Sequence, residues 1–320
     1  MPWLLSSRSS AIRLAPPPPS SLARSSSVSW DISVAGTLHR DDITTPRGHA
    51  TSLGGSAVYF ALAAARHTRV HLNGIVGVDT AERFRAMFEG LPIDMDGLVV
   101  SRTPTFVWHA VHDFDRWVTS SESEEPGCDP EWEPRLGPTS RSAEVLFLGS
   151  MHPRLQHQVL SQAGAGLVGA DSMTVYMREN NVLVRSIASA SDILFLNNEE
   201  IELLAGRTGW REAAHAMSKS GRPRAVVVKQ GPDGAACVVG QQSLEIAAPT
   251  VEDVLDPTGA GDALAGGFLG LCARFERADP AFFGDALAEG VRCAAAAVST
   301  FGTAGLSALA GAGAGRPADV

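Results

Sequence analysis

The stretch Asp256–Gly270, "DPTGAGDALAGGFLG", is the most informative part of the sequence for the fold. It places a glycine-rich turn directly before the acid Asp262, and two more glycines follow where the pattern is otherwise helical. Because Pro257 disfavours helix at the residue before it, an extended segment ends here and a helix is expected to begin near Gly261. Glycine inside a helix costs about 1 kcal/mol relative to alanine. The two helical glycines, Gly266 and Gly267, therefore indicate close packing of this helix against a neighbouring element or a nucleotide.

The turn before this helix has the features of an anion site. Residues Thr258 to Gly261 carry little side chain, so their backbone N–H groups can converge at a helix N-terminus, which favours bound anions. A carboxylate at Asp262 would then lie beside a bound phosphoryl group and could take a proton from a hydroxyl. The alternative is a helix start that Asp262 merely caps. The pattern is neither GxxxxGK[ST] nor GxGxxG after a strand, so the predicted phosphate site is of another kind.

The rest of the chain alternates between two patterns. Short apolar runs at 71–77, 145–150, 192–197 and 225–231 predict strands, and helical patterns separate them at 56–67, 81–89, 154–162, 182–190, 199–205 and 210–220. Nearly continuous apolar strands between helices predict an α/β fold with a mostly parallel central sheet covered on both faces. Residues 105–118 instead alternate apolar and polar side chains, which predicts a small accessory sheet with one wet face.

Three segments are expected to lie outside the regular elements. Residues 1–30 are rich in Arg, Ser and Pro and contain no acidic residue, which predicts a disordered extension with the composition of an organelle transit peptide. The alternative is a disordered extension with no targeting function. Residues 119–138 are acidic and rich in Ser and Pro, so we expect a surface loop. Residues 307–320 are expected to form a flexible tail. The localisation is predicted to be cytoplasmic, or an organelle if residues 1–30 direct import.

Bulk composition excludes several classes. The chain has 320 residues, of which 44% are hydrophobic and 19% charged, enough for one large α/β domain or two small ones. The net charge of -9 gives no basic footprint for nucleic acid. The four cysteines form no CxxC pair, which argues against a zinc site or a disulfide framework. No apolar run reaches the length of a membrane span, so no membrane partner is expected.

Four stretches in order resemble the PfkB (ribokinase-like) carbohydrate kinase family. "DPTGAGDALAGGF" resembles its C-terminal signature, "LGGSAVYFALAAA" (53–65) its di-glycine sugar site, "LNNEEIELLAG" (196–206) its N-x-x-E segment, and "VVVKQGPDGAACV" (226–238) its nucleotide-loop strand. The resemblance implies a three-layer α/β/α sandwich over 31–306, with lid strands near 36–50 and 100–118. It also implies an ATP-dependent kinase that uses Mg²⁺ and phosphorylates a hydroxyl of a sugar or cyclitol.

The resemblance also implies roles for individual residues. Asp262 would be the base, and Gly259, Ala260 and Gly261 the anion hole. Asn197 and Glu200 would organise Mg²⁺ through water, although the same pair could simply cap a helix. The remaining nucleotide contacts would come from Lys229, Gly231, Gly234 and Thr258. Lys229 stands where the family often has threonine or serine, so it could meet a phosphate or be solvated.

On the acceptor side the resemblance points to Asp41, Gly54, Gly55 and Tyr59, with Asp42 as the competing acid. Tyr59 departs from the family's first signature, which has asparagine there, and this weakens ribose or fructose phosphate as the acceptor. No Lys/Arg cluster for a sugar phosphate is visible, which favours a neutral polyol.

Several assignments stay open. Asp171 ends another strand-like run and could face the same cleft, and Asp256 matches a monovalent-cation loop that binds potassium in some members. The lid segment carries Trp108, His109 and Arg116, which could stack on a ligand or only pack. A homodimer through the lid is implied. The alternatives to a sugar or cyclitol kinase are a nucleoside kinase on the same fold and a non-catalytic protein that binds ATP or sugar.

Overall fold

The computed structural model describes residues 29–114, 118–121, 126–219 and 222–314. The predicted N-terminal extension lies almost wholly outside these residues. The main sheet has the strand order β13-β12-β11-β10-β9-β8-β1-β4-β5, and every neighbouring pair from β11 to β5 is parallel. The strands are β1 (Ile32–Ala35), β4 (Val70–Gly77), β5 (Ile93–Ser101), β8 (Val145–Leu148), β9 (Leu167–Asp171), β10 (Ile193–Asn197), β11 (Ala225–Lys229), and the antiparallel β12 (Ala235–Val239) and β13 (Gln242–Ile246).

Helices cover both faces of this sheet. The strand β10 shows why: Ile193 and Phe195 join one hydrophobic core, while Leu194 and Leu196 join the other. The first core is closed by α1 (Ser56–Ala64), α2 (Ala81–Phe88), α9 (Ala260–Phe275), α10 (Phe283–Val298) and α11 (Ala304–Ala314). The second is closed by α3 (Pro138–Ser142), α4 (Pro153–Leu160), α5 (Thr174–Glu179), α6 (Asn181–Ala190), α7 (Asn198–Ala205) and α8 (Trp210–Ser218). The predicted three-layer α/β/α sandwich is confirmed.

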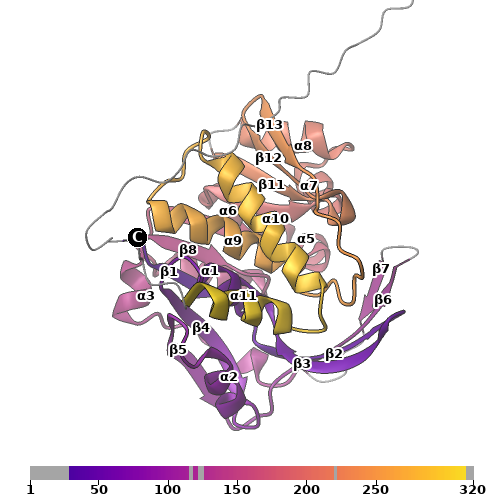
Figure 1. The fold of residues 1–320 in the computed structure, drawn as a ribbon. Coiled ribbons are helices and arrows are strands. Elements are labelled where there is room, and N and C mark those ends of the chain that lie inside the picture. Colours follow the sequence, from indigo (N-terminus) through magenta and orange to yellow (C-terminus); the bar gives the residue numbers. More distant parts are fainter. Residues whose placement is uncertain (1–28, 115–117, 122–125, 220–221, 315–320) are drawn as a thin grey trace, which may run out of the picture.

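A second sheet projects from one side of the sandwich (Figure 1). Its order is β3-β2-β6-β7, with β2 (His39–Thr45), β3 (Gly48–Gly54), β6 (Val107–Asp113) and β7 (Val118–Ser121). Along β6 burial alternates, with Ala110 and His112 buried between more exposed neighbours, as a sheet with one wet face requires. Strands β2 and β6 fall in the two segments where a lid was expected, whereas β3 and β7 begin at the ends of these segments and extend beyond them.

Two expectations about irregular segments need correction. Residues 119–138 include the end of β7 and the short helix η1 (Asp129–Glu131), and they bury Cys128, Trp132 and Leu136 in the second core. These apolar residues recur every four positions, a pattern that the acidic and proline-rich composition conceals. The predicted tail is helical as far as Ala314, since α11 packs on α1 and α10 with Leu306 and Ala310 buried. No helix in the described part of the chain is long and apolar enough to span a bilayer.

Candidate active site

A cavity of about 610 Å³ lies between the lid and the carboxyl ends of the central strands. This is where open α/β sheets bind ligands. The cavity brings together residues from all four stretches that resemble the family, from Gly55 in the first to Asp262 in the last. Among its lining residues are Asp41, Gly55, Tyr59, Asp171, Asn197, Glu200, Lys229, Thr258, Gly259, Gly261 and Asp262.

The glycine turn opens the N-terminus of α9 toward this cavity. The N–H of Ala260 donates to the carbonyl of Pro257 at 3.3 Å, whereas the N–H groups of Gly259 and Gly261 have no hydrogen-bond partner among the described residues. Gly259 has φ 72°, and a Cβ there would lie 2.2 Å from the ring of Tyr59. Only glycine fits this position. Of the three N–H groups expected to form the anion hole, two are therefore free to receive an anion.

Asp262 follows this turn in an acidic environment. Burial raises the pKa of its carboxyl well above the ordinary value, and the nearby charge of Asp171 raises it further. Lys229 opposes both effects because its ammonium favours the ionised carboxylate. A carboxylate with a raised pKa is a stronger base, and the ammonium keeps its ionised form accessible.

Asp171 and Lys229 form a buried ion pair at the ends of β9 and β11. Lys229 Nζ lies 2.6 Å from Asp171 Oδ2, and a Cβ built on Gly261 would be 3.1 Å from the same nitrogen. Burial alone would lower the pKa of Lys229, but the carboxylates of Asp171 and Glu200 raise it. The lysine is therefore a permanent cation beside the glycine turn. Asp171 lines the cavity, as the sequence analysis left open.

Asn197 and Glu200 form a capping box at the start of α7. The N–H of Asn197 donates to Glu200 Oε2 at 2.8 Å, and the N–H of Glu200 donates to Asn197 Oδ1 at 2.9 Å. Burial raises the pKa of Glu200 to about 7, with Lys229 opposing and Asp171 adding to the shift. The capping role expected as an alternative is thus present, and it also fixes both side chains at the cavity wall.

On the acceptor side, Asp41 rather than Asp42 faces the cavity. Asp41 is buried, and the hydroxyl of Tyr59 donates to its Oδ2 at 3.4 Å. Gly54 leaves room for it, because a Cβ there would lie 1.8 Å from Asp41 Oδ2. Asp42 instead pairs with His49 and with His109, at 3.4 Å in the latter case.

Four residues that line this cavity each have a buried polar atom with no hydrogen-bond partner among the described residues. The atoms are Asp41 Oδ1, Ser150 Oγ, Ser172 Oγ and Asp262 Oδ1. Buried polar groups are nearly always paired, and leaving one unpaired costs about 1–3 kcal/mol. Their residues line the wall of the cavity, so hydroxyl groups of a bound ligand are the natural partners for such atoms.

The ionisation of Asp41 should be visible in the pH dependence of acceptor use. Burial raises the pKa of Asp41 to about 6. Protonation turns one of its two acceptor oxygens into a donor and removes the negative charge, so we expect kcat/KM for the acceptor to fall as the pH drops below about 6. In the Asp41→Asn variant the fall below pH 6 should become shallower rather than vanish, because Asp262 and Glu200 still take up a proton there, while KM for ATP at pH 7.5 stays within about threefold. An unchanged pH profile in the variant would assign the inflection to another group.

Several predicted residues lie outside the cavity lining. Gly231 and Gly234 bound the short helix η2 (Gly231–Asp233) after β11, with φ 57° and 105°. Asp256 is buried and accepts from the N–H groups of Thr258 and Gly302, so it ties the glycine turn to the loop before α11. Potassium at Asp256 stays a prediction. Trp108 lines the cavity, whereas Arg116 lies outside the described residues.

Sequence reasoning missed two residues of the cavity wall and one contact made by a lid residue. Ser172 directly follows β9, and Ser150 comes two residues after the end of β8, so their position after strands that end at the cavity was the signal that could have identified them. His112 belongs to lid strand β6, and its Nε2 lies 3.0 Å from Thr258 Oγ1. This bond joins the lid to the glycine turn, and no pattern in the sequence marks such a distant contact.

Comparison with known proteins identifies the family. A model of the pfkB family of carbohydrate kinases matches residues 30–308. This chain belongs to the PfkB family. A cytidine kinase from Thermococcus kodakarensis is 27% identical over 75% of this chain and 87% of its own length. An aminoimidazole riboside kinase from Salmonella typhimurium is 33% identical over 72% of this chain and 76% of its own length.

Solved structures agree on the PfkB fold. Ribokinase from Cryptococcus neoformans, crystallised in complex with ADP, matches with a TM-score of 0.70 at 18% identity, covering 86% of this chain and 95% of that chain. The architecture is therefore ribokinase-like. As a PfkB family member, the chain is a kinase that transfers a phosphoryl group to a hydroxyl acceptor.

Proposed function

We propose that this PfkB kinase transfers the γ-phosphate of ATP to a sugar hydroxyl held between Asp41 and Asp262. The four unpaired buried polar atoms carry this proposal, because their residues line a cavity of about 610 Å³ on both its acceptor and its catalytic side. The curated relatives support it, since both are named as kinases of ribosyl compounds.

The reaction follows from the geometry. Asp262 takes the proton of the acceptor hydroxyl as that oxygen bonds to the γ-phosphorus, and the bond from phosphorus to the bridging oxygen breaks to release ADP. The N–H groups of Gly259 and Gly261 donate to the phosphoryl oxygens as the charge develops. Lys229 adds a fixed positive charge beside the same turn. Asp41 and Tyr59 orient the acceptor from the opposite wall.

The residues near the predicted metal site fit Mg²⁺ held mainly by phosphates and water. The acidic side chains there supply oxygen atoms, which Mg²⁺ prefers, but the described residues contain no cluster of three or more metal-ligating His, Cys, Asp or Glu side chains. Asn197 and Glu200 would hold the ion through its waters. When bound, Mg²⁺ supplies positive charge to the β- and γ-phosphates.

The test is ADP release by the purified chain with ATP and Mg²⁺, with and without potassium. The acceptor panel contains D-ribose, D-fructose, myo-inositol, cytidine and inosine. We expect at least one acceptor to stimulate ADP release, with one phosphorylated acceptor formed for each ADP. Chelation of Mg²⁺ should stop the reaction. If ATP binds but no acceptor raises ADP release above the rate in its absence, the proposed function is wrong.

A further inference from the structure

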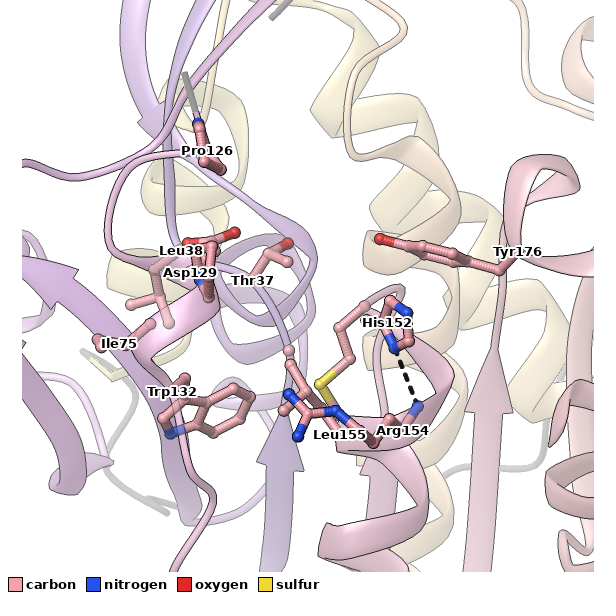
Figure 2. A pocket seen from close by; sticks show the side chains of 13 residues that line it. Thr37, Leu38, Ile75, Pro126, Asp129, Trp132, His152, Arg154, Leu155 and Tyr176 are labelled. Carbon is pink, nitrogen blue, oxygen red and sulfur yellow. Dashed lines mark hydrogen bonds between the residues drawn. The ribbon is translucent and has the colours of Figure 1, made fainter. Parts of the chain in front are cut away.

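A second cavity, of about 390 Å³, adjoins the acceptor cavity. The two share three lining residues: Thr37 after β1, Asp129 in η1 and Tyr176 in α5. Figure 2 shows Tyr176 reaching across the second cavity from α5 toward Thr37, with His152 and Arg154 below it. A ligand held at Asp41 and Asp262 could therefore extend past Thr37 into this space.

The walls of the second cavity are largely apolar and aromatic. Leu38, Ile75, Met151 and Leu155 contribute buried aliphatic surface, and Trp132 is also buried there. Tyr176 is only half-buried, so its ring remains open to a ligand. Its edge-to-face contact with His152, at 5.8 Å between ring centroids, helps to hold the ring in place. Such walls favour a flat, weakly polar group, because the whole face of such a group can stack on the aromatic rings and contact the aliphatic side chains.

The polar groups of the second cavity lie at its margin. His152 Nδ1 accepts a hydrogen bond from the backbone N–H of Arg154 at 3.2 Å. The exposed guanidinium of Arg154 has no ion pair or hydrogen bond with the described side chains. Asp129 lies on the opposite side, with its Oδ2 3.3 Å from His39 Nε2. A phosphate here would meet the Asp129 carboxylate, and no buried cation would compensate. A neutral ring with hydrogen-bonding edges fits this arrangement better.

We propose that the second cavity binds the heteroaromatic base of a nucleoside while the sugar occupies the acceptor cavity. The inference rests on the proposed function and narrows its acceptor from sugars in general to nucleosides. The base lies against the ring of Tyr176, and Arg154 donates to a carbonyl or ring nitrogen at its edge. Thr37 stands at the junction, where the bond between sugar and base would pass.

The test compares nucleosides with a base-free analogue of the same sugar. Cytidine and inosine carry the base, and methyl β-D-ribofuranoside replaces it with a methyl group. We expect Tyr176→Ala to raise KM for the nucleosides about 10–100-fold, since stacking on one aromatic side chain is worth about 1–3 kcal/mol. KM for the methyl riboside should stay within about threefold. Tyr176→Phe keeps the ring and should leave nucleoside KM within about threefold.

A second variant avoids any question of folding. Arg154 is exposed, so Arg154→Ala should leave the melting temperature unchanged while raising KM for the nucleosides about 5–10-fold. Arg185→Ala on α6, another exposed arginine far from the cavity lining, is the matched control and should change nothing. If Tyr176→Ala raises KM for the nucleosides and the methyl riboside equally, or for neither, the subsite is refuted.

Binding separates this inference from the proposed function. In the Asp262→Asn variant, calorimetry measures acceptor binding without turnover. Inosine or cytidine binding at least tenfold more tightly than the methyl riboside would support the base subsite, even if no acceptor were phosphorylated by the unaltered chain. Equal affinity would overturn the subsite, while phosphorylation of a free sugar would leave the proposed function intact.

Discussion

The Asp262→Asn variant is expected to lose about 10²–10⁴-fold in kcat, the usual contribution of a general base. Asparagine keeps the size and shape of the side chain, and its oxygen can still accept from the backbone of residue 262, but it cannot take the proton of the acceptor hydroxyl. The measurement is ADP release at saturating ATP and acceptor. KM for ATP should change by less than about threefold, because the glycine turn and Lys229 are untouched.

This loss should come without any loss of stability. Burial raises the pKa of Asp262 well above its ordinary value, so its ionisation at neutral pH opposes folding. Removing the charge therefore leaves the melting temperature unchanged or raises it, most clearly above neutral pH. A variant that retained more than a tenth of the wild-type kcat would show that another group accepts the proton. A variant that unfolded would contradict the raised pKa of Asp262.

Sequence patterns predicted the layers of the fold because each layer has a local signature. The run of residues 192–197 is apolar at nearly every position, and β10 is indeed buried on both faces. The alternation in 105–118 likewise matched the half-exposed strand β6. The buried Trp132 was missed because its partners in the second core come from strands and helices distant in sequence. Composition averaged over residues 119–138 could not reveal it.

The site was predictable wherever the backbone itself carries the function. A glycine turn before Asp262 has to leave N–H groups free, and two of the three expected groups are free. The contacts between side chains could not be predicted from a local pattern. The hydroxyl of Tyr59 reaches Asp41 while its ring covers Gly259, so the residue that departs from the family pattern couples the acceptor wall to the anion turn. Such a contact follows from the packing of α1 on α9, which no short pattern records.

Lys229→Met is expected to reduce kcat about 10²–10³-fold and to destabilise the fold. Methionine matches the length of lysine but removes the fixed positive charge beside the glycine turn, and loss of one preorganised group that stabilises transition-state charge typically has this effect. Asp171 would be left buried without its ion-pair partner, which costs about 3–5 kcal/mol when a buried pair is broken. Rate and stability are measured by ADP release and by chemical denaturation.

The double variant Lys229→Met with Asp171→Asn separates the two effects. The change of Asp171 to asparagine removes the buried, unpaired negative charge, so most of the lost stability should return. The kcat should stay low, because Lys229 is still missing beside the transferred phosphoryl group. The pH at which kcat reaches half its maximum should rise in Lys229→Met, since the ammonium lowers the pKa of Asp262. Lys219→Met, at the exposed end of α8, is the matched control and should alter neither quantity. If the double variant regained both stability and kcat, Lys229 would serve only to neutralise Asp171, and its role in phosphoryl transfer would be refuted.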